Sequence, residues 1–246
     1  MTKDIYNIFN VKDPIVTKKA KSIEKQIFVL LRDLINSKYP SCLQKEFRIK
    51  WNNILNLFDK YQKEILSCYP LKVTCKKNCG ICCNHWPEDT YSFEVIYIAE
   101  YLKKQRKSEI EKIKNILRDD ILCLKNIKKT IKKKFEALKV SQTYKNIDLY
   151  DVALFSFYQF NRPCPLLDKN GSCSIYKIRP LTCRVYVSFS PPKYCSPNRI
   201  LGNKTLTFLL DIKKEPYNLF DRLNFMYDFF DGNTAFREML YHALTK

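Results

Sequence analysis

Apolar residues recur at every third or fourth position through the first 70 residues, a pattern that predicts two amphipathic helices. Tyr39-Pro40-Ser41 separates these helices and Tyr69-Pro70 ends the second, because proline cannot continue a helix. Trp51 belongs to the apolar stripe and is expected to be a core residue rather than a binding residue. The stripe comprises Ile23, Ile27, Leu30, Leu31, Leu34, Phe47, Trp51, Ile54, Leu55, Phe58, Tyr61 and Ile65.

Further elements follow along the chain. A helix is expected from about Ser92 to Gln105, with Thr90 or Ser92 as its N-cap. The remaining expected elements are a lysine-rich helical stretch, a short strand and two final helices, at 103–139, 204–211, 216–230 and 233–244. Residues 140–150 form a linker into an aromatic segment, YDVALFSFYQF, to which no element is assigned.

The predicted fold class is mainly α, a helical domain around a small irregular cysteine-rich metal core with a short β-hairpin. The chain is expected to be one domain over 1–246, since this length can bury a core of its own. Its expected parts are N-terminal helices (1–70), a cysteine core (71–105 with 155–200), a helical insertion (106–150) and C-terminal helices (201–246).

Composition excludes several functional classes. The four glycines of this 246-residue chain are far apart, so no phosphate-binding loop of the GxGxxG or GxxxxGK type can be written. The two histidines leave little room for histidine-based acid–base catalysis or His-rich zinc sites. Nucleotide binding by those loops is therefore not expected.

The formal charge of +19 comes from 34 lysines and 10 arginines against 25 acidic residues. Arginine is the residue that favours bidentate phosphate contacts, so the lysine excess argues against nucleic acid as the partner. No apolar run approaches the roughly 18 residues of a membrane span, and no signal-peptide pattern opens the chain. We expect a cytoplasmic protein, in which clustered cysteines are metal ligands or redox groups rather than disulfides.

Eight of the eleven cysteines fall into two groups. The first group lies within CKKNCGICCNHW and the second is spread over residues 164–195. Zinc sites and iron–sulfur clusters both use four thiolates. The spacing within either group alone does not bring four thiolates to one metal or cluster. The two groups must therefore meet in space. The candidate metal ligands are Cys75, Cys79, Cys82, Cys83, Cys164, Cys173, Cys183 and Cys195.

The spacing within the first group carries geometric information. Two residues separate Cys79 from Cys82, so both can reach one metal from a tight knuckle, in which Gly80 permits the turn. The side chains of adjacent Cys82 and Cys83 are expected to diverge, one toward a cluster and the other toward a second site. Eight thiolates allow two sites of four, or one cluster with structural or redox cysteines beside it.

The segments around the second group favour the same chemistry. The sequence Asp168-Lys-Asn-Gly171 is typical of a turn and predicts a short hairpin. Arg179-Pro180 resembles the start of a helix. Positive residues near the cysteines would lower thiol pKa values and stabilise a thiolate–metal unit. The residues expected to support the ligand loops are Gly80, Tyr176, Arg179 and Arg184. The three other cysteines, Cys42, Cys68 and Cys123, are expected to be apolar fillers.

These motifs resemble the zinc- or iron-chelating cysteine-cluster family of YkgJ-type CxxCxxCC proteins. The resemblance rests on CGICC at 79–83, RPCPLL at 162–167, CSIYKIRPLTCRVY at 173–186, and Cys195. It implies a protein that carries an iron–sulfur cluster, of the 4Fe-4S type, or zinc, and little more. Our interpretation adds a redox or methyl-transfer role and an unidentified protein substrate or redox partner.

Alternatives of two kinds remain open: enzymes that use a cluster or S-adenosylmethionine, and a binding module as the third alternative after the methyltransferase and the radical enzyme. A branch similar to flagellin lysine N-methylases implies an S-adenosylmethionine-dependent protein lysine methyltransferase, and an Fe–S oxidoreductase would equally use a cluster. The spacing Cys75-x3-Cys79-x2-Cys82 also resembles that of radical S-adenosylmethionine enzymes. The third alternative is a non-enzymatic, metal-stabilised interaction module, in which the lysine-rich stretch docks an acidic partner.

Overall fold

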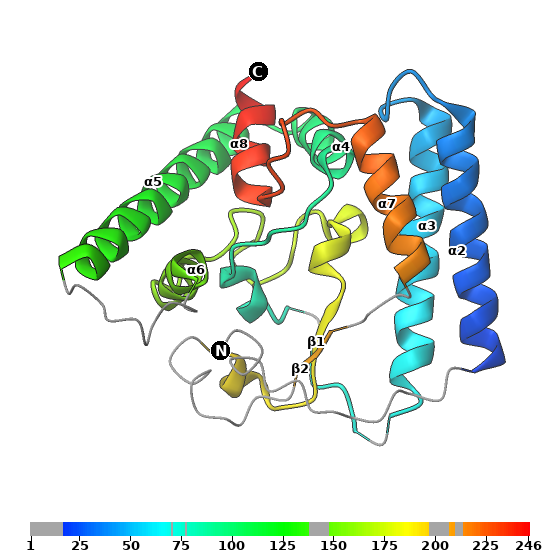
Figure 1. Cartoon of the computed structure of the whole chain (residues 1–246), viewed down its shortest axis with the longest axis horizontal. Helices are drawn as coiled ribbons and strands as arrows, with labels where there is room; N and C mark the ends of the chain where they lie inside the picture. The colour runs from blue at the N-terminus through cyan, green and yellow to red at the C-terminus, as the bar shows by residue number, and fades with distance from the viewer. Residues whose placement is uncertain (1–16, 70, 77, 138–147, 197–206, 210–213) are drawn as a thin grey trace.

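A computed structural model describes residues 17–69, 71–76, 78–137, 148–196, 207–209 and 214–246 (Figure 1). The expected mainly α fold is confirmed. The α-helices are α2 (Lys18–Ser37), α3 (Lys45–Leu66), α4 (Ser92–Leu102), α5 (Lys107–Ala137), α6 (Leu149–Gln159), α7 (Lys214–Met226) and α8 (Phe236–Thr245). Within the part of the chain that the structure describes, none of the helices has the length and apolar character needed to cross a membrane.

The helices form two groups on opposite sides of the cysteine-rich loops (Figure 1). Helices α2, α3 and α7 pack on one another on one side, and α4, α5, α6 and α8 pack on the other. The predicted N-terminal stripe is buried as expected, and Trp51 lies edge-on to Phe93 of α4, with ring centroids 4.7 Å apart. Phe93 thus joins the first group of helices to the second.

Two details of the predicted helices are wrong. Helix α4 ends at Leu102, and its N-cap is Tyr91, which makes no side-chain capping bond. Ser92 instead donates its hydroxyl to Asp228 (3.0 Å). Helix α6 was not predicted, because its segment is apolar on most of its faces and therefore shows no helical periodicity.

A two-stranded antiparallel sheet lies beside the cysteine-rich loops. Strand β1 (Tyr186–Ser188) pairs with β2 (Thr207–Leu209), and Val187 is opposite Phe208. Strand β2 falls within the strand expected at 204–211, whereas its partner β1 was not predicted. The helix start expected at Arg179-Pro180 is only a short 3₁₀ turn. The 3₁₀ turns of this region are η1 (Ile81–Asn84), η3 (Tyr176–Ile178), η4 (Leu181–Cys183) and η5 (Pro192–Cys195).

Candidate metal centre

The two cysteine groups meet in space, as their incomplete spacing required. The backbone N–H of Cys164 donates to the carbonyl oxygen of Cys83 (2.9 Å), which joins segments separated by 80 residues. A second link runs from the Ser172 hydroxyl to Asn78 Oδ1 (2.6 Å). Turn η1, which carries Cys82 and Cys83, also packs against turn η5, which ends at Cys195. Three cysteine-bearing loops therefore converge between the two helical groups.

The turn predicted after Cys164 is present, and Cys164 and Cys173 lie on either side of it in one loop. Asp168 Oδ1 accepts hydrogen bonds from the backbone N–H groups of Asn170 and Ser172, both at 2.8 Å. An isolated antiparallel bridge then pairs Leu167 with Cys173. Because this loop is closed by its own backbone, Cys164 and Cys173 are held a fixed distance apart before any metal binds.

Gly80 and Gly171 allow this loop to dock on the first cysteine group. Gly80 has an ordinary φ of −93°, so its turn does not depend on the left-handed freedom of glycine. A Cβ atom at Gly80 would lie 2.8 Å from Leu167 Cδ1, the end of a flexible side chain, and 3.3 Å from the carbonyl oxygen of Gly171, so glycine at this position allows a close approach of the loop. Gly171 has φ of +75°, and a Cβ there would lie 2.8 Å from the carbonyl oxygen of Asn78.

Arg184 braces the loop between Cys173 and Cys183. Its guanidinium is buried and donates to Asp59 Oδ2 (2.6 Å), to the Lys177 carbonyl (2.8 Å) and to the Arg179 carbonyl (3.1 Å). A buried cation with three acceptors is expensive to remove, because the buried acceptors lose a charge-assisted hydrogen bond. The pairing with Asp59 of helix α3 is the structural basis of the supporting role expected for Arg184.

The other two predicted supporting residues lie at the rim of this loop. The Arg179 guanidinium lies over the ring of Tyr176, 3.9 Å from its centroid, while the Tyr176 side chain itself is exposed. Arg179 also lies 3.9 Å from Asp59. Its positive charge helps to lower the pKa of Cys82, so it acts on the thiols through electrostatics.

Arg237 of helix α8 is the residue that the sequence did not reveal. Its side chain is completely buried, pairs with Asp120 of α5, and donates to the carbonyl oxygens of Cys83 (3.1 Å) and Arg162 (3.0 Å). It also contacts the carbonyl of His85 (3.3 Å). One side chain therefore ties together the backbone next to the first and second cysteine groups.

Asp120 makes this pairing a three-residue network. Its other carboxylate oxygen accepts a hydrogen bond from Arg162 Nε (2.6 Å), and Asp120 is itself fully buried. The guanidinium of Arg237 also lies near the rings of Trp86 (5.6 Å) and Phe157 (5.1 Å), which favour a cation. Helix α5, expected to be part of an insertion, thus reaches the cysteine core through Asp120.

Glu94 of helix α4 is a second buried group that the sequence did not reveal. One of its carboxyl oxygens accepts the backbone N–H of Leu181 (2.9 Å), which positions the turn carrying Cys183. Burial raises the pKa of Glu94 to about 8, and the Leu181 donor and the Arg184 charge oppose this rise. Neither Arg237 nor Glu94 could be found from spacing, since nothing in the sequence distinguishes either one from the other charged residues of its helix.

The thiols nearest strand β1 form one interacting group. The backbone N–H of Ser188 donates to Cys75 Sγ (3.2 Å). Burial raises the pKa of Cys75, this N–H opposes the rise, and three neighbouring thiols raise it further because like charges repel. Those neighbours are Cys79, Cys82 and Cys195. Burial also raises the pKa of Cys195, whereas a hydrogen bond from the Ser188 side chain lowers it.

The thiols of the 164–183 loop form a second interacting group. Cys183 keeps solvent access, yet protein surrounds it densely enough that burial raises its pKa well above the usual value. The negative charge of neighbouring ionised groups adds to the rise, and these groups are the thiols of Cys164, Cys82 and Cys173 and the carboxyl of Glu94. Cys164 and Cys173 both pack against the apolar cluster of α4 and α8. The second group is thus attached to the helices around Arg237.

Cys82 and Cys83 lie where the two groups meet. Both residues belong to the 3₁₀ turn η1, and the divergence expected for their side chains stays a prediction. The Cys83 thiol lowers the pKa of Cys82 to about 7, with Arg179 adding to the effect, while the pKa of Cys83 is raised. Cys82 is therefore the thiol of this pair most readily ionised.

The donor set fits zinc or iron. Thiolates are the ligands that both metals share in cysteine-rich sites, and eight thiols from three loops supply enough donors for two four-ligand sites. Over the described residues, no three His, Cys, Asp or Glu side chains stand in an arrangement that could hold a metal ion. Metal binding is therefore inferred from the donor chemistry and from the family described below, not from ligand geometry.

The three remaining cysteines stand apart from these groups. Cys42 is buried in the core of the N-terminal helices, and burial raises its pKa to about 12. Cys68 donates its S–H to the carbonyl of Glu64 (3.4 Å) at the end of α3. Cys123 packs beside the apolar seam of α5. Their expected role as fillers fits these surroundings.

A helical scaffold around converging cysteine loops defines a mainly α, cysteine-rich class of protein. Residues 74–200 match the model of the CxxCxxCC family, described as "Putative zinc- or iron-chelating domain", and this match covers more than half of the chain. The chain belongs to this family. All eight predicted ligands lie inside the matched range, which confirms the resemblance drawn from the motifs. None of the curated proteins or solved structures compared with the chain matches it.

Proposed function

We propose that this zinc- or iron-chelating protein carries an iron–sulfur cluster on the cysteines of its three converging loops and serves a redox role. The single observation that supports the proposal is the donor set: eight thiols held by backbone hydrogen bonds and by one buried arginine, Arg237. The ligands would be Cys75, Cys79, Cys82, Cys83, Cys164, Cys173, Cys183 and Cys195.

The surroundings of the thiols suit a redox cluster. When bound, such a cluster supplies one-electron transfer at a potential set by hydrogen bonds to sulfur and by solvent exposure. The Ser188 N–H already points at Cys75 Sγ, and Cys75, Cys82 and Cys183 remain solvent-accessible. Arg179 and Arg184 place positive charge near thiolates that would carry net negative charge. An external electron partner could therefore approach the loops closely.

Metal analysis and a visible spectrum of protein purified without oxygen test this proposal. We expect iron and acid-labile sulfide in the protein, with a broad visible absorption that bleaches on chemical reduction. A colourless protein with stoichiometric zinc would contradict the cluster and leave a structural metal site. A protein free of both metals would contradict metal binding altogether. S-adenosylmethionine-dependent methyl transfer stays a prediction of the resemblance.

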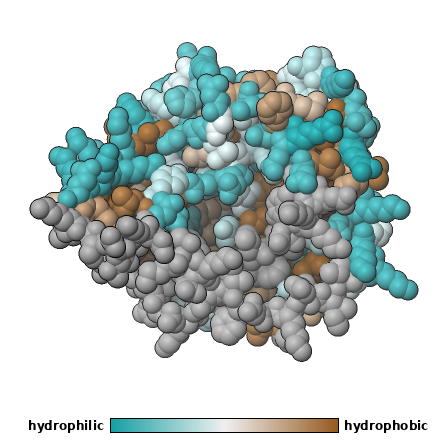
Figure 2. Space-filling model, viewed as in Figure 1, coloured by the Kyte–Doolittle hydropathy of each residue, from teal (hydrophilic) through white to brown (hydrophobic). Residues whose placement is uncertain are grey.

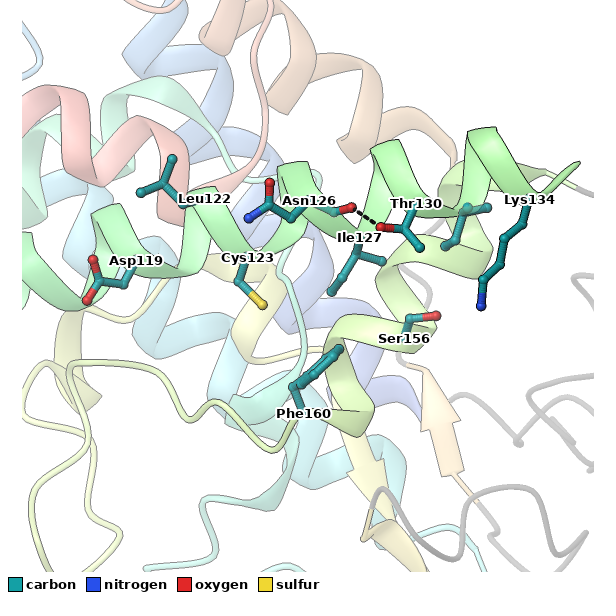
Figure 3. Close-up of a pocket in the computed structure, with 10 residues that line it drawn as sticks. Asp119, Leu122, Cys123, Asn126, Ile127, Thr130, Lys134, Ser156 and Phe160 are labelled. Atoms are coloured by element: carbon teal, nitrogen blue, oxygen red, sulfur yellow. Dashed lines mark hydrogen bonds between the residues drawn. The ribbon is translucent and has the colours of Figure 1, made fainter. Parts of the chain in front are cut away.

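One observation favours a second candidate function, a docking module for an acidic partner. A groove of about 620 Å³ runs between α5 and α6 (Figure 3). Leu122, Ile127, Ile131 and Phe160 supply apolar walls, and Leu122 and Phe160 are 51% and 62% exposed. An apolar groove of this kind can accept the apolar face of an amphipathic helix.

The positive charge beside the groove favours a helix that carries acidic residues. Lys125, Lys129 and Lys133 are four residues apart on α5, so they form one row next to the row that contains Leu122. Lys134 lines the groove itself, and hydrophilic side chains predominate over the part of the visible face that is coloured in Figure 2. The groove and the lysine row together fit an amphipathic helix with acidic residues beside its apolar stripe.

A fluorescein-labelled synthetic helix with leucine at i, i+3, i+4 and i+7 and glutamate beside them serves as the probe for this candidate. In a fluorescence anisotropy titration, Lys125→Gln, Lys129→Gln and Lys133→Gln together should weaken binding about tenfold, since three exposed ion pairs contribute roughly 0.2–1 kcal/mol each. The control variant carries the same change at Lys107, Lys112 and Lys114, on the other half of α5. An equal loss in both variants, or no binding, would contradict docking in the groove.

A further inference from the structure

We propose that the converging cysteine loops form the docking surface for an acidic redox protein. This inference rests on the proposed function, because it names the kind of partner that would exchange electrons at the same site. Three of the eight candidate ligands are exposed, namely Cys75, Cys82 and Cys183. All three lie on these loops, so a partner that exchanges electrons through the exposed thiols must cover the loops rather than the helices.

The charge of these loops is almost entirely positive. Residues 71–86 and 162–196 together contain nine lysines and arginines and a single acidic residue, Asp168. The rest of the chain has a far more even balance, with 24 acidic residues and 35 lysines and arginines. Asp168 Oδ1 accepts the backbone N–H groups of Asn170 and Ser172, so even this carboxylate is used within its own turn. The positive charge of the loops therefore exceeds what the lysine-rich composition of the chain alone would give.

The cations that a partner can reach on these loops are lysines. Arg184 is buried, Arg162 pairs with Asp120, and Arg179 lies over the ring of Tyr176. Five lysines of the loops are exposed, and within the described part of the chain none of the five forms an ion pair with a carboxylate. These lysines are Lys72, Lys76, Lys169, Lys177 and Lys193. Their ammonium groups are therefore available to the carboxylates of another molecule.

Contacts between the loops bring these exposed lysines together from distant parts of the sequence. Lys76 lies within the first cysteine group, and Lys169 lies in the turn whose Ser172 hydroxyl bonds Asn78 Oδ1 (2.6 Å). Lys193 lies in turn η5, which packs against turn η1. Each of the three converging loops therefore contributes an exposed lysine, and the thiols and the positive charges occupy the same region of the molecule.

The exposed aromatic residues of the loops favour a protein over nucleic acid as the partner. Tyr176 and Tyr186 are 58% and 50% exposed, and tyrosine is enriched in the centres of protein–protein interfaces. Nucleic-acid bases stack on free ring faces, and phosphates favour the fork of arginine. The Arg179 guanidinium already covers one face of the Tyr176 ring, and the exposed cations are lysines, which suit carboxylates as point charges.

The lysines also answer an electrostatic problem of electron exchange at this site. Thiolates that hold a metal or cluster carry negative charge, which would repel an acidic partner. Exposed ammonium groups beside the thiols offset this repulsion and attract the partner over a distance of about 10 Å at moderate salt. Electron-transfer encounters use small interfaces and are weak. We therefore expect binding that is weak and that falls as the ionic strength rises.

Fluorescence anisotropy with a short fluorescein-labelled poly-L-glutamate, titrated with the full-length protein at low ionic strength, tests the surface. The test variant carries Lys76→Gln, Lys177→Gln and Lys193→Gln and should bind the probe about tenfold more weakly than wild-type protein. The control variant loses the same charge on α5, through Lys125→Gln, Lys129→Gln and Lys133→Gln, and should keep most of the affinity. Carbodiimide cross-linking of the wild-type complex, followed by peptide mass spectrometry, should attach the probe to the exposed lysines of the cysteine loops.

An equal loss of affinity in the two variants, cross-links confined to α5, or no binding by wild-type protein would overturn the docking surface. So would a single-stranded oligonucleotide of matched charge that binds more tightly than the peptide and loses its affinity in the test variant, because the partner would then be nucleic acid. Metal analysis of the same preparation keeps the two proposals distinguishable. Iron-loaded protein that does not bind the probe overturns only the docking surface, whereas zinc-loaded protein that binds it overturns the redox role.

Discussion

Replacing Arg237 with methionine is expected to lower the free energy of unfolding by about 3–5 kcal/mol, because it removes the fully buried one of the two cations that pair with buried Asp120. Asp120 would keep only Arg162, and the carbonyl oxygens of Cys83 and Arg162 would lose their buried donor. Methionine has nearly the same length as the arginine stem, so little of the loss comes from an empty cavity. Chemical denaturation followed by circular dichroism measures the change.

The same substitution at an exposed arginine of α5 is the matched control. Arg118 has a half-exposed side chain and only a long contact to Asp119 (3.5 Å), so Arg118→Met should change stability by no more than about 1 kcal/mol. We further expect Arg237→Met to release metal from folded protein, since Arg237 fixes the backbone on both sides of the cysteine core. Equal effects of the two substitutions would show that Arg237 does not hold the cysteine loops.

Replacing Gly171 with alanine should be the second large effect. An L-residue in the left-handed region costs about 1–2 kcal/mol, and Gly171 has φ of +75°. The added Cβ would also lie 2.8 Å from the Asn78 carbonyl, a backbone atom that cannot rotate away. Forcing a methyl group into such a contact costs about 1–3 kcal/mol more. The 164–173 loop would then dock poorly on the first cysteine group.

The variant Gly232→Ala distinguishes the conformational cost of alanine from the cost of the close contact. Gly232 has nearly the same φ, +78°, but a Cβ there would meet no atom within 4 Å. Gly232→Ala should therefore show only the conformational cost and retain its metal. The difference in unfolding free energy between the two variants measures the docking contact itself. If Gly171→Ala is no worse than Gly232→Ala, the packing of this loop on Asn78 does not contribute to stability.

Hydrophobic periodicity was sufficient to predict most of the helices. The stripes of α2 and α3 face the core because they have polar residues on their opposite faces. Helix α6 was missed for the converse reason, since its sequence lacks a polar face. Strand β1 is only three residues long and pairs with a strand distant in the sequence, so no local pattern could identify it.

The sequence likewise predicted one part of the candidate site and not the other. Clustering and spacing were enough to identify the eight cysteines as candidates, because free thiols rarely occur in such dense groups. Their partition could not be predicted, since it depends on which loop each thiol meets in three dimensions. Arg237 lies on a helix far from the motifs in sequence, and Glu94 lies on a helix that carries none of them. A buried arginine and a surface arginine look alike until the fold brings three carbonyl oxygens around one of them.

Differential alkylation tests most directly the claim that these eight cysteines bind metal. The native protein is treated with iodoacetamide before and after metal removal by a chelator, and peptide mass spectrometry reports each modified cysteine. We expect the eight candidate ligands to be protected in the metal-loaded protein and modified after chelation. Cys68 and Cys123 should react in both states, and Cys42, only 1% exposed, in neither. Modification of the eight cysteines to the same extent in both states would contradict the metal centre.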